Sequence, residues 1–212
     1  MRIARTVDEA SGFEPSVLTI GNFDGVHLGH RKLFDQVIAA ARERGLRATV
    51  LTFDPHPACI VAPQRAPRLL TTVEERCELM REQGLEQVFI LRFTAEIAHL
   101  SPEEFVRRMI VDALRARIVL VGANFRFGYK QAGNTRVLAE MAEANGYETR
   151  VAGAVKCRGE IVSSSLIRRS IQAGEVSRAR RFLGRPYSIA GEVVQGHGIG
   201  AKQTVPTLNL RT

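Results

Sequence analysis

The sequence predicts an α/β fold in which helices cover both faces of a parallel, doubly wound sheet. Short apolar runs of strand length alternate with longer amphipathic segments through most of the 212 residues, as in βαβ units. These runs contain few polar residues, which is typical of strands buried on both faces. Three of them lead into unusual loops, rich in glycine, proline or aromatic residues, at residues 21–30, 54–57 and 122–128.

The first predicted unit joins a strand at residues 17–20 to an amphipathic helix through residues 21–30, here called the opening loop. This loop contains three glycines and two histidines, and the helix after it ends at Gly45. A strand, a glycine loop and a helix N-terminus together direct backbone N–H groups and the helix dipole at an anion, most often a phosphate. The opening loop therefore predicts a nucleotide site. The apolar stripe of the helix consists of Leu33, Phe34, Val37, Ile38 and Ala41.

The elements that follow continue this alternation as far as residue 184. Glycine ends helices, proline interrupts strands, and a Ser or Thr with a Glu three residues later marks a helix start as a capping box. The predicted capping boxes pair Thr71 or Thr72 with Glu74 or Glu75, and Ser101 with Glu104. In order, we expect a strand at 48–53, a loop at 54–70, a helix ending at Gly84, a strand at 87–93, a helix from 101 to about 114, a strand at 118–121, a helix at about 135–145, a strand near 149–155, a hairpin through 158–159 and two short helices within 163–184.

The three unusual loops should meet at one place. In a doubly wound sheet, ligands bind beyond the carboxyl ends of the strands, at the point where the strand order reverses. Residues 21–30, 54–57 and 122–128 each follow the carboxyl end of a predicted strand. We therefore expect them to converge on one crevice, although each loop alone also has an ordinary structural interpretation.

Composition narrows the class of protein. No run is long and apolar enough to span a bilayer, and the N-terminus lacks the apolar centre of a signal peptide. The three widely spaced cysteines suggest reduced thiols rather than disulfides or a zinc site. The net charge of +8 comes without a basic stripe interleaved with aromatics. We expect a cytoplasmic protein that binds neither nucleic acid nor membrane, and the oligomeric state stays open.

The alternation of predicted strands and helices ends near Tyr187. Residues 188–195 are predicted as a strand, and a loop containing Gly196, Gly198 and Gly200 follows. We interpret residues 1–185 as one domain and residues 186–212 as the incomplete beginning of a second, β-rich domain.

Four motifs carry a resemblance to a known family: GNFDGVHLGH at 21–30, TFDPHP at 52–57, GANFRFG at 122–128 and VSSSLIR at 162–168. In order and spacing they resemble the bacterial bifunctional riboflavin kinase/FAD synthetase. Four motifs in register are more specific than His-x-Gly-His alone, which many nucleotidyltransferases share. The resemblance covers about residues 15–212. It implies a Rossmann-like sheet of the HxGH nucleotidyltransferase type, followed by an incomplete riboflavin kinase β-barrel.

The resemblance also implies a reaction, in which the adenylyl group of ATP is transferred to FMN to give FAD and pyrophosphate. The FMN phosphate would attack the α-phosphorus directly, with Mg²⁺ and no covalent enzyme intermediate. Such a reaction depends on positioning and on neutralising charge on the triphosphate. Two alternatives stay open: another HxGH nucleotidyltransferase, acting on pantetheine phosphate or nicotinamide mononucleotide, and a flavin-nucleotide binding module without turnover.

The resemblance assigns roles to residues around the triphosphate. His27 and His30 would donate hydrogen bonds to phosphate oxygens, more strongly if protonated, and Arg168 would neutralise the β- and γ-phosphates. Asp24 would lie near the nucleotide, although an Asp beside a Gly also favours an Asx turn. The serines before Arg168 have an alternative interpretation as ordinary helix caps. The implied ATP-binding residues are Gly21, Asn22, Phe23, Asp24, Gly29, Ser163, Ser164 and Ser165.

The resemblance further implies a flavin pocket and a kinase motif. The flavin-binding residues would be Pro55, His56, Pro57 and Asn124. Thr207 and Asn209 match a Pro-Thr-x-Asn motif that the family associates with magnesium and ATP. The family's catalytic glutamate is absent from these 212 residues, so we expect no riboflavin kinase activity from them. The metal ligands stay open.

Overall fold

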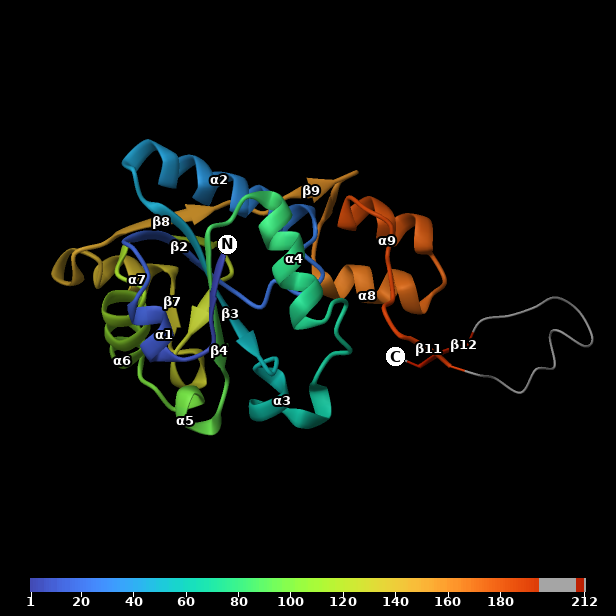
Figure 1. Ribbon diagram of the computed structural model, residues 1–212, viewed down its shortest axis with the longest axis horizontal. Coiled ribbons are helices and arrows are strands. Elements are labelled where there is room, and N and C mark those ends of the chain that lie inside the picture. Colours follow the sequence, from blue (N-terminus) through green and yellow to red (C-terminus); the bar gives the residue numbers. More distant parts are fainter. Residues whose placement is uncertain (195–208, 212) are drawn as a thin grey trace, which may run out of the picture.

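A computed structural model of the protein describes residues 1–194 and 209–211. Its centre is a six-stranded sheet in the order β1-β4-β3-β2-β5-β8, and every neighbouring pair is parallel (Figure 1). The predicted Rossmann-like, doubly wound sheet is confirmed. Its strands are β1 (Arg2–Ala4), β2 (Ser16–Ile20), β3 (Arg47–Asp54), β4 (Gln87–Arg92), β5 (Ala116–Gly122) and β8 (Glu148–Ala152).

Both faces of the four central strands, β4, β3, β2 and β5, are buried, which explains why these strands read as continuous apolar runs, whereas the edge strands β1 and β8 are partly exposed. Neighbouring residues along a strand enter different cores: Val17 of β2 packs into one hydrophobic cluster and Leu18 into the other. The first core is completed by α2 (Leu28–Arg44) and α4 (Val73–Gln83). The opposite core is completed by α1 (Val7–Ser11), α6 (Pro102–Phe105), a π-helix (Val106–Ala113) and α7 (Thr135–Glu140).

Helix boundaries follow the capping signals. Thr72 and Glu75 form the capping box of α4, and Ser101 and Glu104 form that of α6. Left-handed glycines end α2, α4 and α9 (Val176–Leu183), at Gly45, Gly84 and Gly184. The predicted helix pair is α8 (Ser164–Gln172) with α9, and the hairpin before it pairs β9 (Lys156–Cys157) with β10 (Glu160–Ile161).

Several predicted elements differ in detail. The sequence reading missed β1 and α1, because three and five residues are too short to show a period. The loop predicted at 54–70 contains α3 (Ala58–Val61) and a 3₁₀ turn (Pro63–Arg65). The helix predicted from 101 to 114 continues from α6 as a π-helix, and the one at 135–145 is α7 followed by a 3₁₀ turn (Glu143–Asn145). The structure also contains α5 (Ala95–Ala98), a 3₁₀ turn (Tyr129–Gln131) and the small pair β6 (Arg126–Phe127) and β7 (Gly133–Asn134).

The strand order places β2 at the reversal point of the sheet. β3 lies on one side of β2 and β5 on the other, so the loops after these three strands leave from neighbouring carboxyl ends. α8 and α9 pack together beside them, in a third hydrophobic cluster that includes Leu70 and Leu28. This arrangement positions the opening loop between the sheet and the C-terminal helices.

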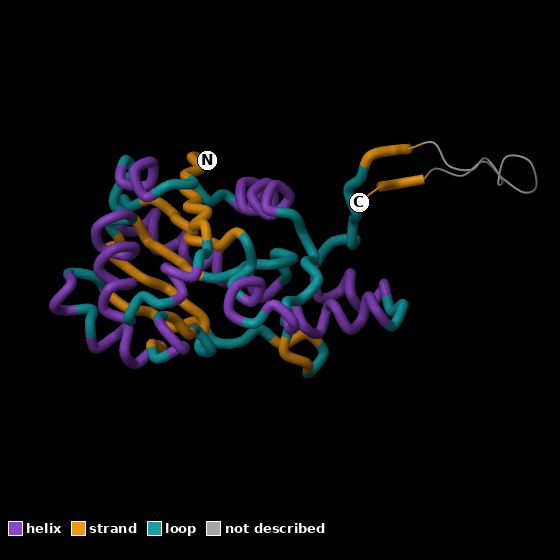
Figure 2. Tube along the Cα trace, turned by 90° about the horizontal axis from the view of Figure 1, so that it is seen from below, coloured by secondary structure: helices purple, strands orange, loops and turns teal. Residues whose placement is uncertain are grey.

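The C-terminal segment leaves the sheet altogether. The strand predicted at 188–195 is the shorter β11 (Glu192–Val194), and it pairs antiparallel with β12 (Asn209–Arg211). Figure 2 shows this ribbon standing apart from the main body. The predicted glycine loop at 196–200 lies outside the described residues. Among the described residues, no helix is long and apolar enough to cross a membrane.

The end of α4 provides a test of whether a left-handed glycine is required there. Gly84 has φ +99°, a conformation that strains any L-residue, and an added Cβ there would meet only Ile38 Cδ1 at 3.7 Å. Gly84→Ala should therefore lower the free energy of unfolding by about 1–2 kcal/mol through backbone strain alone. Gly153→Ala is the matched control, because its φ is ordinary and no atom lies within 4 Å of the added Cβ. Equal urea midpoints for the two variants would contradict this prediction.

Candidate active site

The candidate site is built where the opening loop leaves β2 and enters α2. Hydrogen bonds join this loop to three other segments: the end of β3 with residues 54–57, residues 68–71 before α4, and the start of α8. Among the described residues, no hydrogen bond joins Asn124 to these segments, and the Asn124 side chain is exposed. Two of the three predicted loops, residues 21–30 and 54–57, are thus in contact, and the start of α8 also contacts the first of them.

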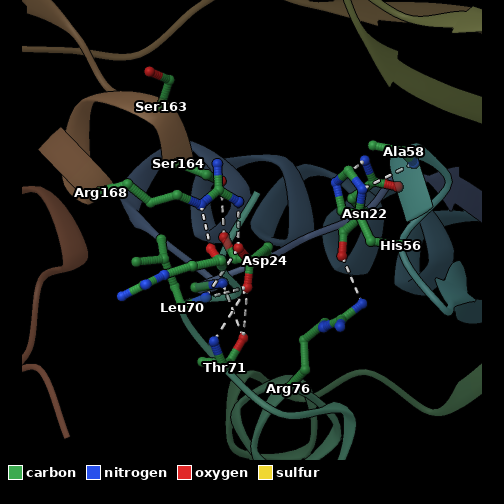
Figure 3. Close-up of polar contacts among 12 residues, drawn as sticks. Asn22, Asp24, His56, Ala58, Leu70, Thr71, Arg76, Ser163, Ser164 and Arg168 are labelled. Carbon is green, nitrogen blue, oxygen red and sulfur yellow. Dashed lines mark hydrogen bonds and ion pairs between the residues drawn. The ribbon is translucent and has the colours of Figure 1, made fainter. Parts of the chain in front are cut away.

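Asp24 is the centre of these contacts. Its carboxylate is only 2% exposed and accepts hydrogen bonds from the backbone N–H groups of Leu70 and Thr71, at 2.9 and 3.1 Å, and from the Thr71 hydroxyl, at 3.2 Å. Arg168 Nη2 lies 2.5 Å from its other oxygen. Figure 3 shows Arg168 and Ser164 on one side of Asp24 and Leu70 and Thr71 on the other. The Asx-turn interpretation was wrong, since the bonded residues lie 46 or more positions away.

Arg168 is held from two directions. Its Nε donates to the Arg68 carbonyl at 2.7 Å while Nη2 pairs with Asp24, and 15% of its side chain is exposed. Neighbouring Arg169 is exposed and makes none of these contacts. The structure therefore distinguishes the two arginines, and only Arg168 belongs to the buried network.

The three serines before Arg168 have different surroundings. The Ser163 hydroxyl accepts from Leu166 N–H at 3.3 Å and is the N-cap of α8, as in the ordinary capping interpretation. The Ser164 hydroxyl donates to the Asp24 carbonyl at 2.9 Å, which ties α8 to the opening loop. Ser165 is exposed in the first turn of α8. Of the three serines, Ser165 is therefore the most exposed.

His27 and His30 form a stacked pair at the start of α2. Their ring centroids lie 3.6 Å apart, with 18° between the ring planes. His27 is the N-cap of the helix, and its Nδ1 accepts from the His30 backbone N–H at 3.3 Å, so in the neutral ring Nε2 carries the proton. Gly29 is needed for this approach, because a Cβ there would lie 3.0 Å from His27 Cε1.

Burial keeps both histidines neutral near pH 7. It lowers the pKa of His27 from 6.5 to about 4. Burial also lowers the pKa of His30 well below its ordinary value, and the electrostatic effects of His27 and Arg76 act in the same direction. His30 Nδ1 is buried without a hydrogen-bond partner among the described residues. In the free chain these rings are neutral donors, rather than the protonated ones considered from the sequence.

Asn22 and His56 connect the opening loop to residues 54–57. The Asn22 amide lies 3.0 Å from His56 Nε2, and His56 Nδ1 accepts from the Ala58 N–H at 3.1 Å. Burial, followed by the charge of Arg168, lowers the pKa of His56, so the ring is neutral with its proton on Nε2. The structure places Asn22 Nδ2 against this Nε2, which brings two donors face to face, so the contact becomes a hydrogen bond when the amide oxygen and nitrogen are exchanged. His56 thereby fixes the loop rather than standing free.

The other predicted residues lie at the edges of the network. Phe23 is buried against Phe34 and meets the edge of His30, so it belongs to the core. An added Cβ at Gly21 would lie 3.0 Å from the Phe23 ring. Pro55 is exposed and Pro57 precedes α3. Thr207 lies outside the described residues, and of Asn209 only its backbone place in β12 is described.

Sequence reasoning missed residues that complete the network: Leu70, Thr71, Arg76 and Arg185. Arg76 Nη1 donates to the Asn22 carbonyl at 2.8 Å, and Arg185 Nη1 donates to the Val26 carbonyl at 3.3 Å. The sequence indicates Thr71 only as a possible helix cap, and the other three lie in no recognisable motif. The partners of all four in the opening loop are 46 to 159 positions away. Only the folded chain brings them together.

The described residues contain no group of three or more His, Cys, Asp or Glu side chains placed to hold a metal ion. Asp24, the buried carboxylate nearest the histidines in sequence, is already occupied by Arg168 and backbone donors. What the described residues offer around the two histidines is therefore a set of N–H donors and cations, the groups that suit anions.

Comparison with known proteins agrees with the four motifs. The chain is 35% identical over 207 residues to the bifunctional riboflavin kinase/FMN adenylyltransferase of Listeria monocytogenes, which covers 97% of this chain and 65% of that protein. Its identity to the protein of the same name from Escherichia coli K12 is 34% over 198 residues, covering 93% and 63% respectively. The chain thus spans less than two thirds of the length of these curated relatives.

A solved structure and two family matches complete the comparison. A crystal structure described as a macrolide-efflux protein from Streptococcus pneumoniae matches with a TM-score of 0.86 at 28% identity, over 99% of this chain and 68% of that one. Residues 183–212 match the riboflavin kinase family, and residues 10–166 match the FAD synthetase family. Because the second match covers most of the sequence, the chain belongs to the FAD synthetase family.

Proposed function

We propose that this chain transfers the adenylyl group of ATP to FMN, giving FAD and pyrophosphate. The observation that carries the proposal is the cluster at the end of β2, where His27, His30 and Arg168 are gathered between the N-termini of α2 and α8. Family membership and the names of the relatives support FMN as the acceptor.

The chemistry requires an in-line displacement at the α-phosphorus. The FMN phosphate oxygen forms the new P–O bond as the bond to pyrophosphate breaks, and no proton abstraction from the attacking phosphate is needed. The protein's task is to align the two substrates and stabilise the charge on the triphosphate. His27 Nε2–H, the first N–H groups of α2 and the start of α8 are the donors proposed for the phosphate oxygens, with Gly29 allowing close approach.

Arg168 supplies less net charge than the sequence suggests. Its guanidinium is already paired with Asp24, so the pair together is close to neutral. Of its nitrogens, Nε and Nη2 are engaged with protein oxygens, which leaves Nη1 for a β- or γ-phosphate. Asp24 therefore orients Arg168, and Ser165 on the same helix turn adds a hydroxyl.

Mg²⁺ is proposed to arrive with ATP. It prefers oxygen ligands and usually binds through one or two carboxylates together with substrate phosphates. The donors that the described residues offer around the histidines are N–H groups and cations, which suit the phosphates rather than the metal. When bound, Mg²⁺ would neutralise charge on the triphosphate and leaving pyrophosphate.

The flavin is proposed to lie against residues 54–57, with Pro55 and Pro57 as a stiff wall. His56 would hold this wall in place through Asn22, because its Nε2 lies 3.0 Å from the Asn22 amide while its Nδ1 accepts from the Ala58 N–H. Asn124, on the loop after β5, is proposed to contact the flavin from the exposed side. ATP and FMN as substrates accord with a cytoplasmic location.

We further propose that residues 1–185 form the adenylyltransferase domain and residues 186–212 the beginning of a riboflavin kinase-like barrel. The riboflavin kinase match at 183–212 and the departure of β11 from the main sheet support this boundary.

The direct test is to mix the protein with Mg²⁺, ATP and FMN and to follow FAD and pyrophosphate. FAD should form, and pantetheine phosphate or nicotinamide mononucleotide in place of FMN should give no adenylylated product. His30→Ala should lower kcat by about 100-fold, as expected for loss of a charge-stabilising group, with little change in FMN affinity. His99→Ala is the matched control, because His99 is exposed, bonds to Ala95 in its own turn and stacks on exposed Tyr129, away from the opening loop.

Three results would decide against the proposal. Turnover of pantetheine phosphate or nicotinamide mononucleotide would favour the related transferases. Binding of ATP and FMN without any FAD would favour a binding module. Equal rates for His30→Ala and His99→Ala would remove the opening loop from the chemistry.

The buried histidines also predict a pH dependence of stability. The pKa of His27 is about 4 in the folded chain and 6.5 as an ordinary value, so the unfolded chain binds the proton more tightly. Stability is therefore fully present above pH 6.5 and is lost as the pH falls toward 4. Between pH 6.5 and 5 the loss from His27 should be roughly 1.5 kcal/mol.

Urea unfolding of the wild type and of His27→Asn at these two pH values measures this loss. Asparagine is a good N-cap, so the substitution keeps the helix start while removing the titrating ring. The variant should lose less stability on acidification than the wild type. The same loss in both proteins would show that His27 does not titrate below its ordinary range.

A further inference from the structure

Arg76, in the middle of α4, is a buried cation that no motif assigns. It is 3% exposed, and its Nη1 donates to the Asn22 carbonyl at 2.8 Å, to the Thr52 hydroxyl at 3.0 Å and to the Phe53 carbonyl at 3.4 Å. Asn22 lies just beyond β2, and Thr52 and Phe53 lie at the end of β3. One side chain therefore holds the carboxyl ends of two neighbouring strands.

The charge of Arg76 is incompletely satisfied by the protein. Among the described residues, no carboxylate forms an ion pair with Arg76 within 4 Å. Its Nε is buried without a hydrogen-bond partner. Burial lowers the pKa of Arg76, with Asp24 and Asp54 acting more weakly in the opposite direction. A buried cation costs several kcal/mol unless an opposite charge or good hydrogen bonds offset it. Retaining it suggests that an anion completes its surroundings.

The position of Arg76 relates it to both proposed substrates. It contacts the opening loop, proposed to bind ATP, and the strand end that leads into residues 54–57, proposed to bind FMN. Its positive charge also contributes to lowering the pKa values of His30 and His56, one from each side of the site. Figure 3 shows its side chain directed at Asn22, beside His56.

We propose that Arg76 is a positioning residue for adenylyl transfer, which holds the ATP-side and FMN-side loops in register and places a fixed positive charge beneath the reacting phosphates. This inference rests on the proposed function. In-line attack requires the reacting atoms about 3–3.5 Å apart, and a displacement of about 1 Å can slow the reaction on the order of 100-fold. Fixing two strand ends with one rigid guanidinium is a direct way to keep that alignment.

The competing interpretation is that Arg76 only stabilises the fold. The two roles predict different effects of a lysine substitution, and different values of kcat for variants that are fully folded. Lysine keeps the charge but has a compact ammonium in place of the planar guanidinium, so it loses the geometry by which Nη1 reaches its three acceptors. Methionine keeps much of the apolar stem and loses both the charge and the hydrogen bonds.

The experiment compares Arg76→Lys and Arg76→Met with the matched control Arg81→Met. Arg81 lies on the same helix, but it is 47% exposed and pairs with Glu78 at the surface. All are assayed for FAD formation at a temperature where circular dichroism shows each to be folded, and ATP and FMN affinities are measured separately by titration calorimetry. Arg76→Met should lower kcat by about 100-fold while each dissociation constant changes by less than about fivefold. Arg76→Lys should recover about tenfold of that loss, and Arg81→Met should match the wild type.

The outcomes separate this inference from the proposed function. If the wild type forms FAD and both Arg76 variants, corrected for the folded fraction, turn over at the wild-type rate, the positioning role is overturned and the function stands. If Arg76→Met does not fold, Arg76→Lys decides alone: an unchanged kcat overturns the role, and a roughly tenfold lower kcat with unchanged affinities supports it. Failure of the wild type to form FAD overturns the proposed function and the role of Arg76 with it.

Discussion

The site depends on one buried ion pair, between Asp24 of the opening loop and Arg168 of α8. A carboxylate that is 2% exposed is stable only if its charge is matched, and here Arg168 and donors from Leu70 and Thr71 match it. The pair joins residues 144 positions apart and fixes the opening loop against α8 and the entry to α4. The position of the stacked histidines follows, since they lie on the loop that Asp24 anchors.

The same pair determines how positive charge is distributed. Arg168 is largely neutralised by Asp24, and burial keeps His27, His30 and His56 neutral near pH 7. In the proposed reaction, the attraction for a triphosphate would come from helix N-termini, from oriented N–H groups and from Arg76, with Mg²⁺ proposed to arrive with the substrate. This is a site of prearranged dipoles with few free charges, which avoids the cost of several unpaired buried cations.

Local signals in the sequence were enough to predict the sheet, the capping boxes at Thr72 and Ser101 and the glycine helix ends. They also located the histidine loop, whereas Arg168 was identified through the family resemblance. The sequence could not show β1, which is too short to have a pattern, or the continuation of α6 as a π-helix. It could not reveal the partners of Asp24 or the burial of Arg76 either, because these arise from contacts between distant segments. The protonation of the histidines likewise depends on burial, which no motif encodes.

The most direct measurement is a double-mutant cycle on the buried pair, with Asp24→Asn, Arg168→Gln and the double variant compared in urea unfolding. Each single change leaves one buried partner unpaired and should cost about 3–5 kcal/mol. The double variant should then cost at least about 1 kcal/mol less than the sum of the two, while Arg169→Gln, on the exposed neighbour, should cost almost nothing. Strictly additive losses, or an equal effect of Arg168→Gln and Arg169→Gln, would contradict the central place given to this pair.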